Sequence, residues 1–175
     1  MSPLTFGETE ALLAQINGIR SHKRATFMAR LKNLLRLGLL PNVSRGRGSR
    51  SVFEPIEVFI FAMAVELTQF GLAPERVVNM LAPPTIAQRM MDHFRFRPNE
   101  PVSFDPRALA TMDGGNPMGF VFGSPANSQA HRRIAQINIR PLLEDIADAL
   151  PDSHHQWFFD ELAQTSNAAV GPVAA

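Results

Sequence analysis

The chain of 175 residues contains no cysteine. This absence excludes a disulfide framework, thiolate zinc sites and cysteine nucleophiles, and it is typical of proteins in a reducing compartment. The N-terminus also lacks the basic start and apolar run of a signal peptide. We therefore expect a cytoplasmic protein.

Long hydrophobic runs are lacking as well. The most apolar stretch, 56–70, is 15 residues long and carries two glutamates. A membrane-spanning helix needs roughly 20 apolar residues. We expect a buried helix there and no membrane partner.

The chain has none of the glycine-rich or nucleophile motifs that indicate common enzyme classes. It holds no Gly-x-Ser-x-Gly motif, phosphate loop or dinucleotide glycine pattern. His154 and His155 stand near Asp152 and Asp160, but adjacent histidines point in different directions and make a poor metal site. We expect no catalytic residues, no cofactor and no metal.

Acidic residues are missing from one long segment. The chain has 17 Lys and Arg against 16 Asp and Glu residues, a net charge of +1. That balance hides an asymmetry, because residues 1–100 hold 13 basic and 8 acidic side chains, whereas residues 101–175 hold 4 and 8. Residues 20–50 include nine cations and no acid. Solvated helix faces normally mix both signs, so this segment indicates contact with nucleic acid.

Apolar periodicity predicts two helices around this basic segment. A first short helix is expected over 8–19 and a second over 22–37, where apolar residues recur at i, i+4, i+7 and i+8. Ser21 is placed to cap the second helix, and Gly38 is placed to end it. The remaining face of the second helix is cationic.

A glycine-containing basic segment follows at 43–53. Glycines at 46 and 48 suit a tight turn between two short extended arms that both carry arginine. We interpret the segment as a β-hairpin wing, with a disordered Arg-Gly linker as the alternative. A core helix over 55–70 and a short helix over 75–81 come next, each opened by proline. Two prolines at 83–84 then mark a domain boundary.

The second half predicts a small α+β unit over 83–163. An amphipathic helix is expected over 85–94 and an acidic helix over 142–150. Short strands are expected over 102–104, 108–112, 119–122 and 134–139, with an Asp-Gly-Gly-Asn turn between the second and third. The tail 164–175 has no packing pattern and is expected to be disordered.

Two helices, the second of them basic, a basic hairpin and a buried third helix make a winged helix-turn-helix. The predicted fold class is mainly α with small β content, in which this module over 1–82 precedes the α+β unit. A helix held by a small core can lay its outer side in the major groove, whose base edges carry a readable pattern.

Three segments resemble MerR-type transcription regulators. Residues 30–41, Arg-Leu-Lys-Asn-Leu-Leu-Arg-Leu-Gly-Leu-Leu-Pro, are similar to that family's recognition-helix signature. Residues 53–58, Phe-Glu-Pro-Ile-Glu-Val, resemble its junction between wing and third helix, and residues 69–77 resemble the start of its fourth helix. The order and spacing agree over about 8–82. The resemblance implies a DNA-binding winged domain, with Lys32 in place of a DNA-contacting arginine and Phe53 in place of a wing tyrosine.

Some positions depart from the family pattern. The family's aromatic pair corresponds to Asn33 and Leu34, its acid to Leu35 and its wing arginine to Ser51. The chain also has neither the family's long dimerising helix nor its cysteine ligands, so thiolate metal sensing is excluded.

The residues themselves predict a set of DNA contacts. Thr26, Arg30 and Asn33 share one outward strip, where Arg30 and Asn33 match guanine and adenine edges in bidentate geometry. The other cations of the helix suit phosphates, and the wing arginines suit the backbone or minor groove. The predicted DNA-binding residues are Lys23, Arg24, Arg30, Lys32, Asn33, Arg36, Arg45, Arg47 and Arg50.

We therefore expect a sequence-specific regulator that binds double-stranded DNA in the bacterial nucleoid. A homodimer is expected, formed through 85–96, the strand-rich segment or 141–150, because two recognition helices then meet two half-sites. Two alternatives stay open. One is an architectural or excisionase-like DNA-bending protein, and the other is a regulator whose C-terminal unit senses a small-molecule or protein effector.

Overall fold

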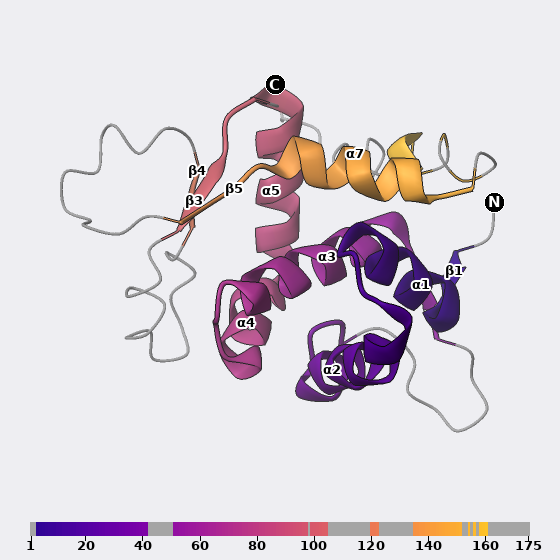
Figure 1. Cartoon of the computed structure of the whole chain (residues 1–175). Coiled ribbons are helices and arrows are strands. Elements are labelled where there is room, and N and C mark those ends of the chain that lie inside the picture. The colour runs from indigo at the N-terminus through magenta and orange to yellow at the C-terminus, as the bar shows by residue number, and fades with distance from the viewer. Residues whose placement is uncertain are drawn as a thin grey trace.

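Helices make up most of the described structure. The computed structural model describes residues 3–41, 51–97, 99–104, 120–122 and 135–151, together with positions 154, 156 and 158–160. The helices are α1 (Phe6–Ile16), the 3-10 turn η1 (Ser21–Lys23), α2 (Arg24–Leu37), α3 (Pro55–Gln69), α4 (Pro74–Leu81), α5 (Pro84–Phe96) and α7 (Ile139–Ala149) (Figure 1). The prediction of a mainly helical chain with small β content is confirmed.

The strands form two small antiparallel sheets. They are β1 (Leu4–Thr5), β2 (Val52–Phe53), β3 (Val102–Phe104), β4 (Phe120–Phe122) and β5 (Ala135–Ile137). In one sheet β1 pairs with β2, and in the other β3 lies between β4 and β5. The expected strands near 102, 120 and 136 are confirmed, whereas 108–112 and the turn at 113–116 lie outside the described residues.

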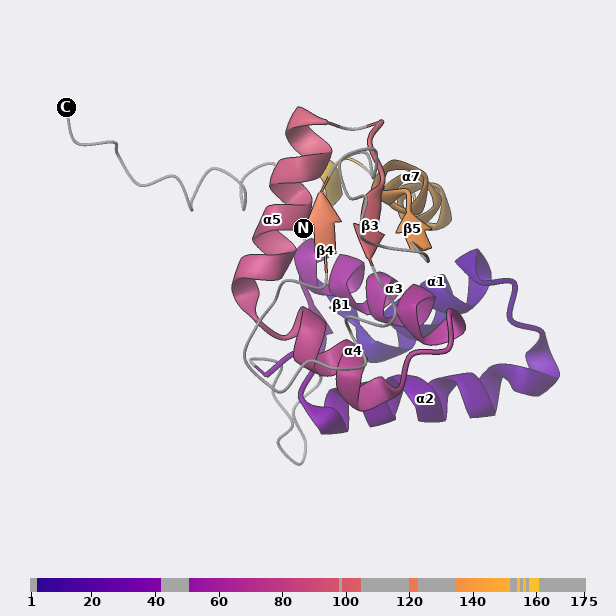
Figure 2. The ribbon, with the colours of Figure 1, turned by 90° about the vertical axis from the view of Figure 1, so that its left-hand side faces the viewer.

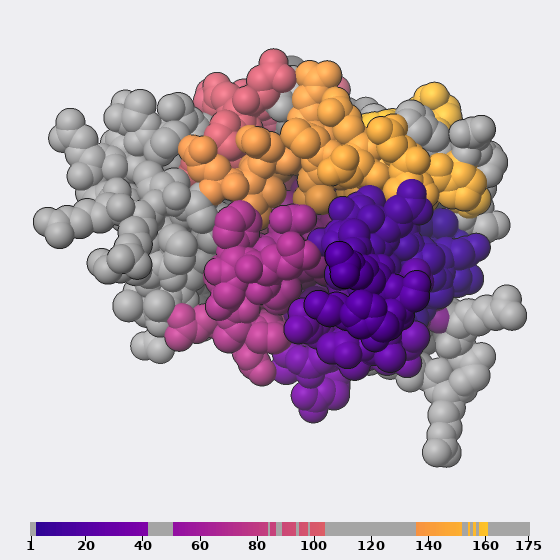
Figure 3. Space-filling model, in the orientation of Figure 1, coloured from indigo at the N-terminus to yellow at the C-terminus, as the bar shows by residue number. Residues whose placement is uncertain are grey.

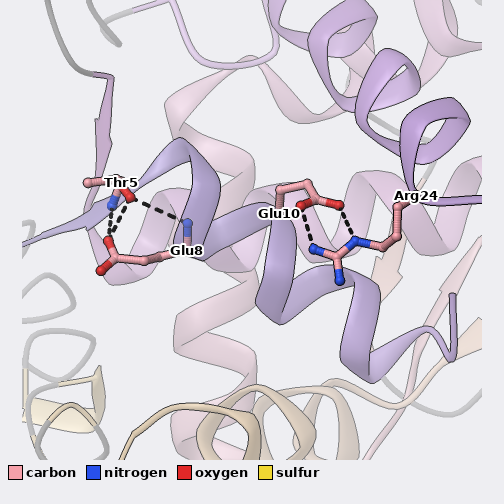
Figure 4. Close-up of polar contacts among 4 residues, drawn as sticks. All are labelled: Thr5, Glu8, Glu10 and Arg24. Carbon is pink, nitrogen blue, oxygen red and sulfur yellow. Dashed lines mark hydrogen bonds and ion pairs between the residues drawn. The ribbon is translucent and has the colours of Figure 1, made fainter. Parts of the chain in front are cut away.

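A side-chain cap fixes the start of α1. The Glu8 carboxylate accepts a hydrogen bond from the Thr5 backbone N–H at 2.7 Å, and the Thr5 hydroxyl oxygen accepts one from the Glu8 N–H at 3.4 Å (Figure 4). This reciprocal capping box satisfies two N–H groups that the first turn leaves without helical partners. The bonds from Thr5 lower the pKa of Glu8. The helix therefore begins at Phe6, ahead of the predicted start at Glu8.

The expected helix over 22–37 divides into two elements. Ser21–Lys23 form the 3-10 turn η1, and α2 begins at Arg24. The prediction that Ser21 caps this helix is wrong, because Lys23 occupies the cap position and α2 has no side-chain cap. Its C-terminal end is as predicted. Gly38 adopts φ +103°, the left-handed conformation in which a helix stops.

The core is built around α3. Pro55 opens this helix, as predicted, and Val58, Phe59 and Phe61 are fully buried. Phe53 stacks on Phe61 with ring centroids 5.7 Å apart, so the strand that leads into α3 is attached to the same core.

Residues of the C-terminal half join that core. Leu143 and Ile146 of α7, together with Phe158, belong to the same buried cluster as the apolar side of α1. α7 packs on α1, and Figure 3 shows the orange surface of α7 lying against the indigo N-terminal segment. The predicted division of the chain near 82 stays a prediction. Among the described helices, every one falls short of the length and apolarity that a membrane crossing requires.

Candidate nucleic-acid interface

α2 lies at the edge of the molecule. In two views at right angles it is the lowest of the labelled helices, on the opposite side from α7 (Figures 1 and 2). Phe27, Leu31 and Leu34 are its buried residues and hold it on the core. Its outer side is exposed over the whole length of the helix, at Ala25, Thr26, Ala29, Arg30, Lys32 and Arg36.

No acid lies between Glu10 and Glu54 in the sequence, so α2 and its flanks carry cations alone. Lys23 and Arg30 are exposed, and within the described part of the chain neither has an acidic partner. These two side chains are therefore available to an external anion.

Arg24 is tied to α1 by an ion pair. Its Nε donates to Glu10 Oε1 at 2.8 Å and its Nη2 donates to Glu10 Oε2 at 2.6 Å (Figure 4). Glu10 is only 6% exposed. The hydrogen bonds that Arg24 donates to this carboxylate raise the pKa of Arg24. A bidentate arginine–carboxylate pair is geometrically specific. It neutralises a buried acid and orients α2 against α1, a role that the sequence reasoning missed.

Two further cations on α2 have partners within the chain. The Lys32 ammonium lies 5.8 Å from the centroid of the Phe6 ring, a cation–π distance that leaves the exposed charge accessible. Arg36 Nη2 donates to Asn33 Oδ1 at 2.9 Å. Bidentate recognition of adenine uses both the oxygen and the amide nitrogen of asparagine. The Arg36 bond uses one of the two lone pairs of Asn33 Oδ1 and orients the amide, so the other lone pair and the amide N–H groups stay available to a base edge.

The residues predicted to read bases line a hollow of about 510 Å³. Thr26, Arg30 and Asn33 form the α2 side of this hollow, and the end of α3 with the turn into α4 forms the other side. The predicted outward strip of α2 therefore faces partly toward α3, whereas Lys32 does not line the hollow.

Of the predicted wing, 43–53, the structure describes only residues 51–53. Arg45, Arg47 and Arg50 lie outside the described residues. The second predicted arm is β2, which pairs with β1 in the register Leu4 to Phe53 and Thr5 to Val52. The Phe6 N–H also donates to the Ser51 carbonyl at 3.2 Å. Residues 51–53, at the end of the predicted wing, are thus held to β1, a strand too short for the sequence pattern to reveal.

The histidines and acidic residues are the candidates for a metal site. Within the described residues there is no cluster of three or more His, Cys, Asp or Glu side chains that could hold a metal ion. His155 and Asp152 lie outside that set. His93 is buried, and its Nε2 lies 2.8 Å from the Glu100 carbonyl oxygen.

Comparisons of the chain with protein-family models, with curated proteins and with solved structures found no match. The resemblance to MerR-type regulators therefore stays a prediction from the three sequence segments that carry it.

Proposed function

We propose that this chain is a sequence-specific double-stranded DNA-binding regulator of the winged helix-turn-helix type, with α2 as its recognition helix. The observation that carries the proposal is that α2 lies at the edge of the molecule with an exposed side bearing cations, in a segment without acids. Phosphates attract such a surface by counterion release, and the attraction depends strongly on salt.

The shape of α2 suits the major groove. Its 14 residues span about 21 Å at 1.5 Å per residue, and the groove is about 12 Å wide, enough to admit a helix. Ala25 and Ala29 are exposed on the outer side, and their small side chains let the backbone approach the base edges.

The side-chain partners favour different roles for the predicted residues. Lys23, Lys32 and Arg36 would neutralise phosphates, whereas Arg30 and Asn33 would reach base edges. Arg24 would orient α2 through Glu10, and its predicted contact with a phosphate would compete with that pair. The wing arginines would complete the footprint, in a homodimer that presents two recognition helices to two half-sites.

Selection of bound sequences from a random duplex pool tests specificity directly. We expect one enriched, two-fold symmetric motif. Enrichment of no motif, together with strong bending of bound DNA, would instead support the architectural alternative. Failure to bind duplex at low salt would overturn the proposal.

A double variant tests whether α2 is the helix that binds. Lys32→Gln with Arg36→Gln should flatten the slope of log affinity against log salt by about 0.9 for each phosphate that the variant no longer neutralises. Arg140→Gln is the control for loss of a cation away from α2, because Arg140 lies on α7 and pairs with Glu144 at 2.7 Å; its effect is compared per charge removed. The assignment fails if the double variant keeps the wild-type affinity and salt slope.

A further inference from the structure

The hollow beside α2 has an apolar floor. Leu31 and Leu34 of α2 and Val65 of α3 close it from below and are themselves buried. The apolar surface that the hollow offers to a ligand comes from the half-buried side chains of Ile19, Leu72 and Pro74. Its volume of about 510 Å³ falls within the range of 300–1,000 Å³ that is usual for small-molecule sites. The hollow is therefore large enough for a small organic ligand.

The wall formed by α3 is held in place by local bonds. The Thr68 hydroxyl donates to the Val65 carbonyl at 2.8 Å, and Gln69 Nε2 donates to Asn17 Oδ1 at the end of α1. Gly71 has φ +88°, a left-handed conformation that turns the chain from α3 into Leu72. The wall opposite α2 is thus preformed, so a ligand need not order it on binding.

Arg30 supplies the single charge of the hollow. Among the described residues that line it, Arg30 alone is ionisable, and the other polar lining groups are hydroxyls and amides. Arg30 is exposed and has no acidic partner within the described chain. An apolar floor beside one arginine is complementary to an apolar molecule that carries one carboxylate.

We propose that this hollow binds a small apolar monocarboxylate, with the apolar part against Ile19, Leu72 and Pro74 and the carboxylate on Arg30. Binding itself does not depend on DNA. A second consequence rests on the proposed function: the ligand occupies Arg30 and the side of α2 that would read bases, so ligand and DNA compete for α2.

Octanoate and its uncharged isostere octanamide test the site, with calorimetric titration of the full chain. Octanoate should bind, and octanamide should bind roughly tenfold more weakly, because it cannot form the charge-assisted pair. Arg30→Gln should weaken octanoate roughly tenfold and leave octanamide unchanged. Arg140→Gln removes the same charge from α7 and should leave octanoate binding unchanged.

Leu72→Trp locates the ligand, since the larger ring fills the hollow from an exposed turn. Loss of octanoate binding in this variant, with thermal unfolding still cooperative, supports the site. Equal binding of octanoate and octanamide to the wild type, or octanoate binding that survives both Arg30→Gln and Leu72→Trp, overturns it.

Competition between octanoate and DNA is measured in a separate experiment. Octanoate should weaken binding of the selected duplex by the wild type and not by Leu72→Trp. If the wild type binds octanoate but no duplex, the proposed function fails and the carboxylate site stands. If it binds both without mutual effect, competition is overturned.

Discussion

Phe53 is the side chain that anchors β2 to the core. It is 0% exposed, it stacks on Phe61 at 5.7 Å, and it lies 6.3 Å from the Phe6 ring in a tilted arrangement. Replacing a buried phenylalanine by alanine removes its transfer free energy and leaves a cavity, at a typical cost of about 3–5 kcal/mol. The two aromatic pairs place Phe53→Ala toward the upper end of that range.

Val52→Ala is the matched control for this prediction. Val52 is the neighbouring residue of β2, but it points away from the core and is 44% exposed. Its truncation should cost less than about 1 kcal/mol, the span of strand propensity. Urea unfolding at equilibrium measures both variants, provided that the denaturant slope is unchanged. The reasoning is refuted if Phe53→Ala destabilises the chain no more than Val52→Ala does.

Two further predictions concern the helix end and a half-buried acid. Gly38→Ala should destabilise the chain by about 1–2 kcal/mol, because alanine is strained at φ +103°. A methyl group would meet no other atom at either Gly38 or Gly7, so backbone strain is the difference between the two positions. Gly7→Ala within α1 should therefore not destabilise the chain, and chemical denaturation of both variants tests this. Burial, and then the charge of Asp145, raise the pKa of Glu66. The Glu66 carboxyl therefore holds its proton more tightly in the folded state than in the unfolded state. Folding stability is lost as the pH rises from the ordinary pKa through the raised one, where Glu66 ionises. Glu66→Gln should raise the melting temperature at neutral pH, and the gain should vanish below the ordinary pKa of 4.5; a gain that persists there would contradict this cause.

The helices were the predictable part of the fold, because their signals are local. Apolar spacing located α2 and α3, and proline and glycine marked ends such as Pro55 and Gly38. The strand β1 was missed, since two residues carry no alternation and its partner Phe53 lies far along the chain. The cap at Thr5 was readable from Glu8 three residues later, a signal that the prediction overlooked.

The candidate site was predictable in composition and less so in geometry. Sequence alone showed that nine cations and no acid occupy 20–50, and that Lys32 and Asn33 avoid the apolar face of their helix. It could not show that Arg36 holds the Asn33 amide, because the pattern fixes a residue's angular position and not its rotamer.

The sequence by itself determined that one helix would be basic on its outer side and that a buried helix would support it. Only the tertiary structure decided which cations are available to a ligand. Arg24 is taken by Glu10 on α1, Lys32 lies over Phe6, and Arg30 stands at an apolar hollow. The physical reason is that helical periodicity determines which residues share a face, whereas their partners come from α1 and α3, which only the packing of the chain brings into contact with α2.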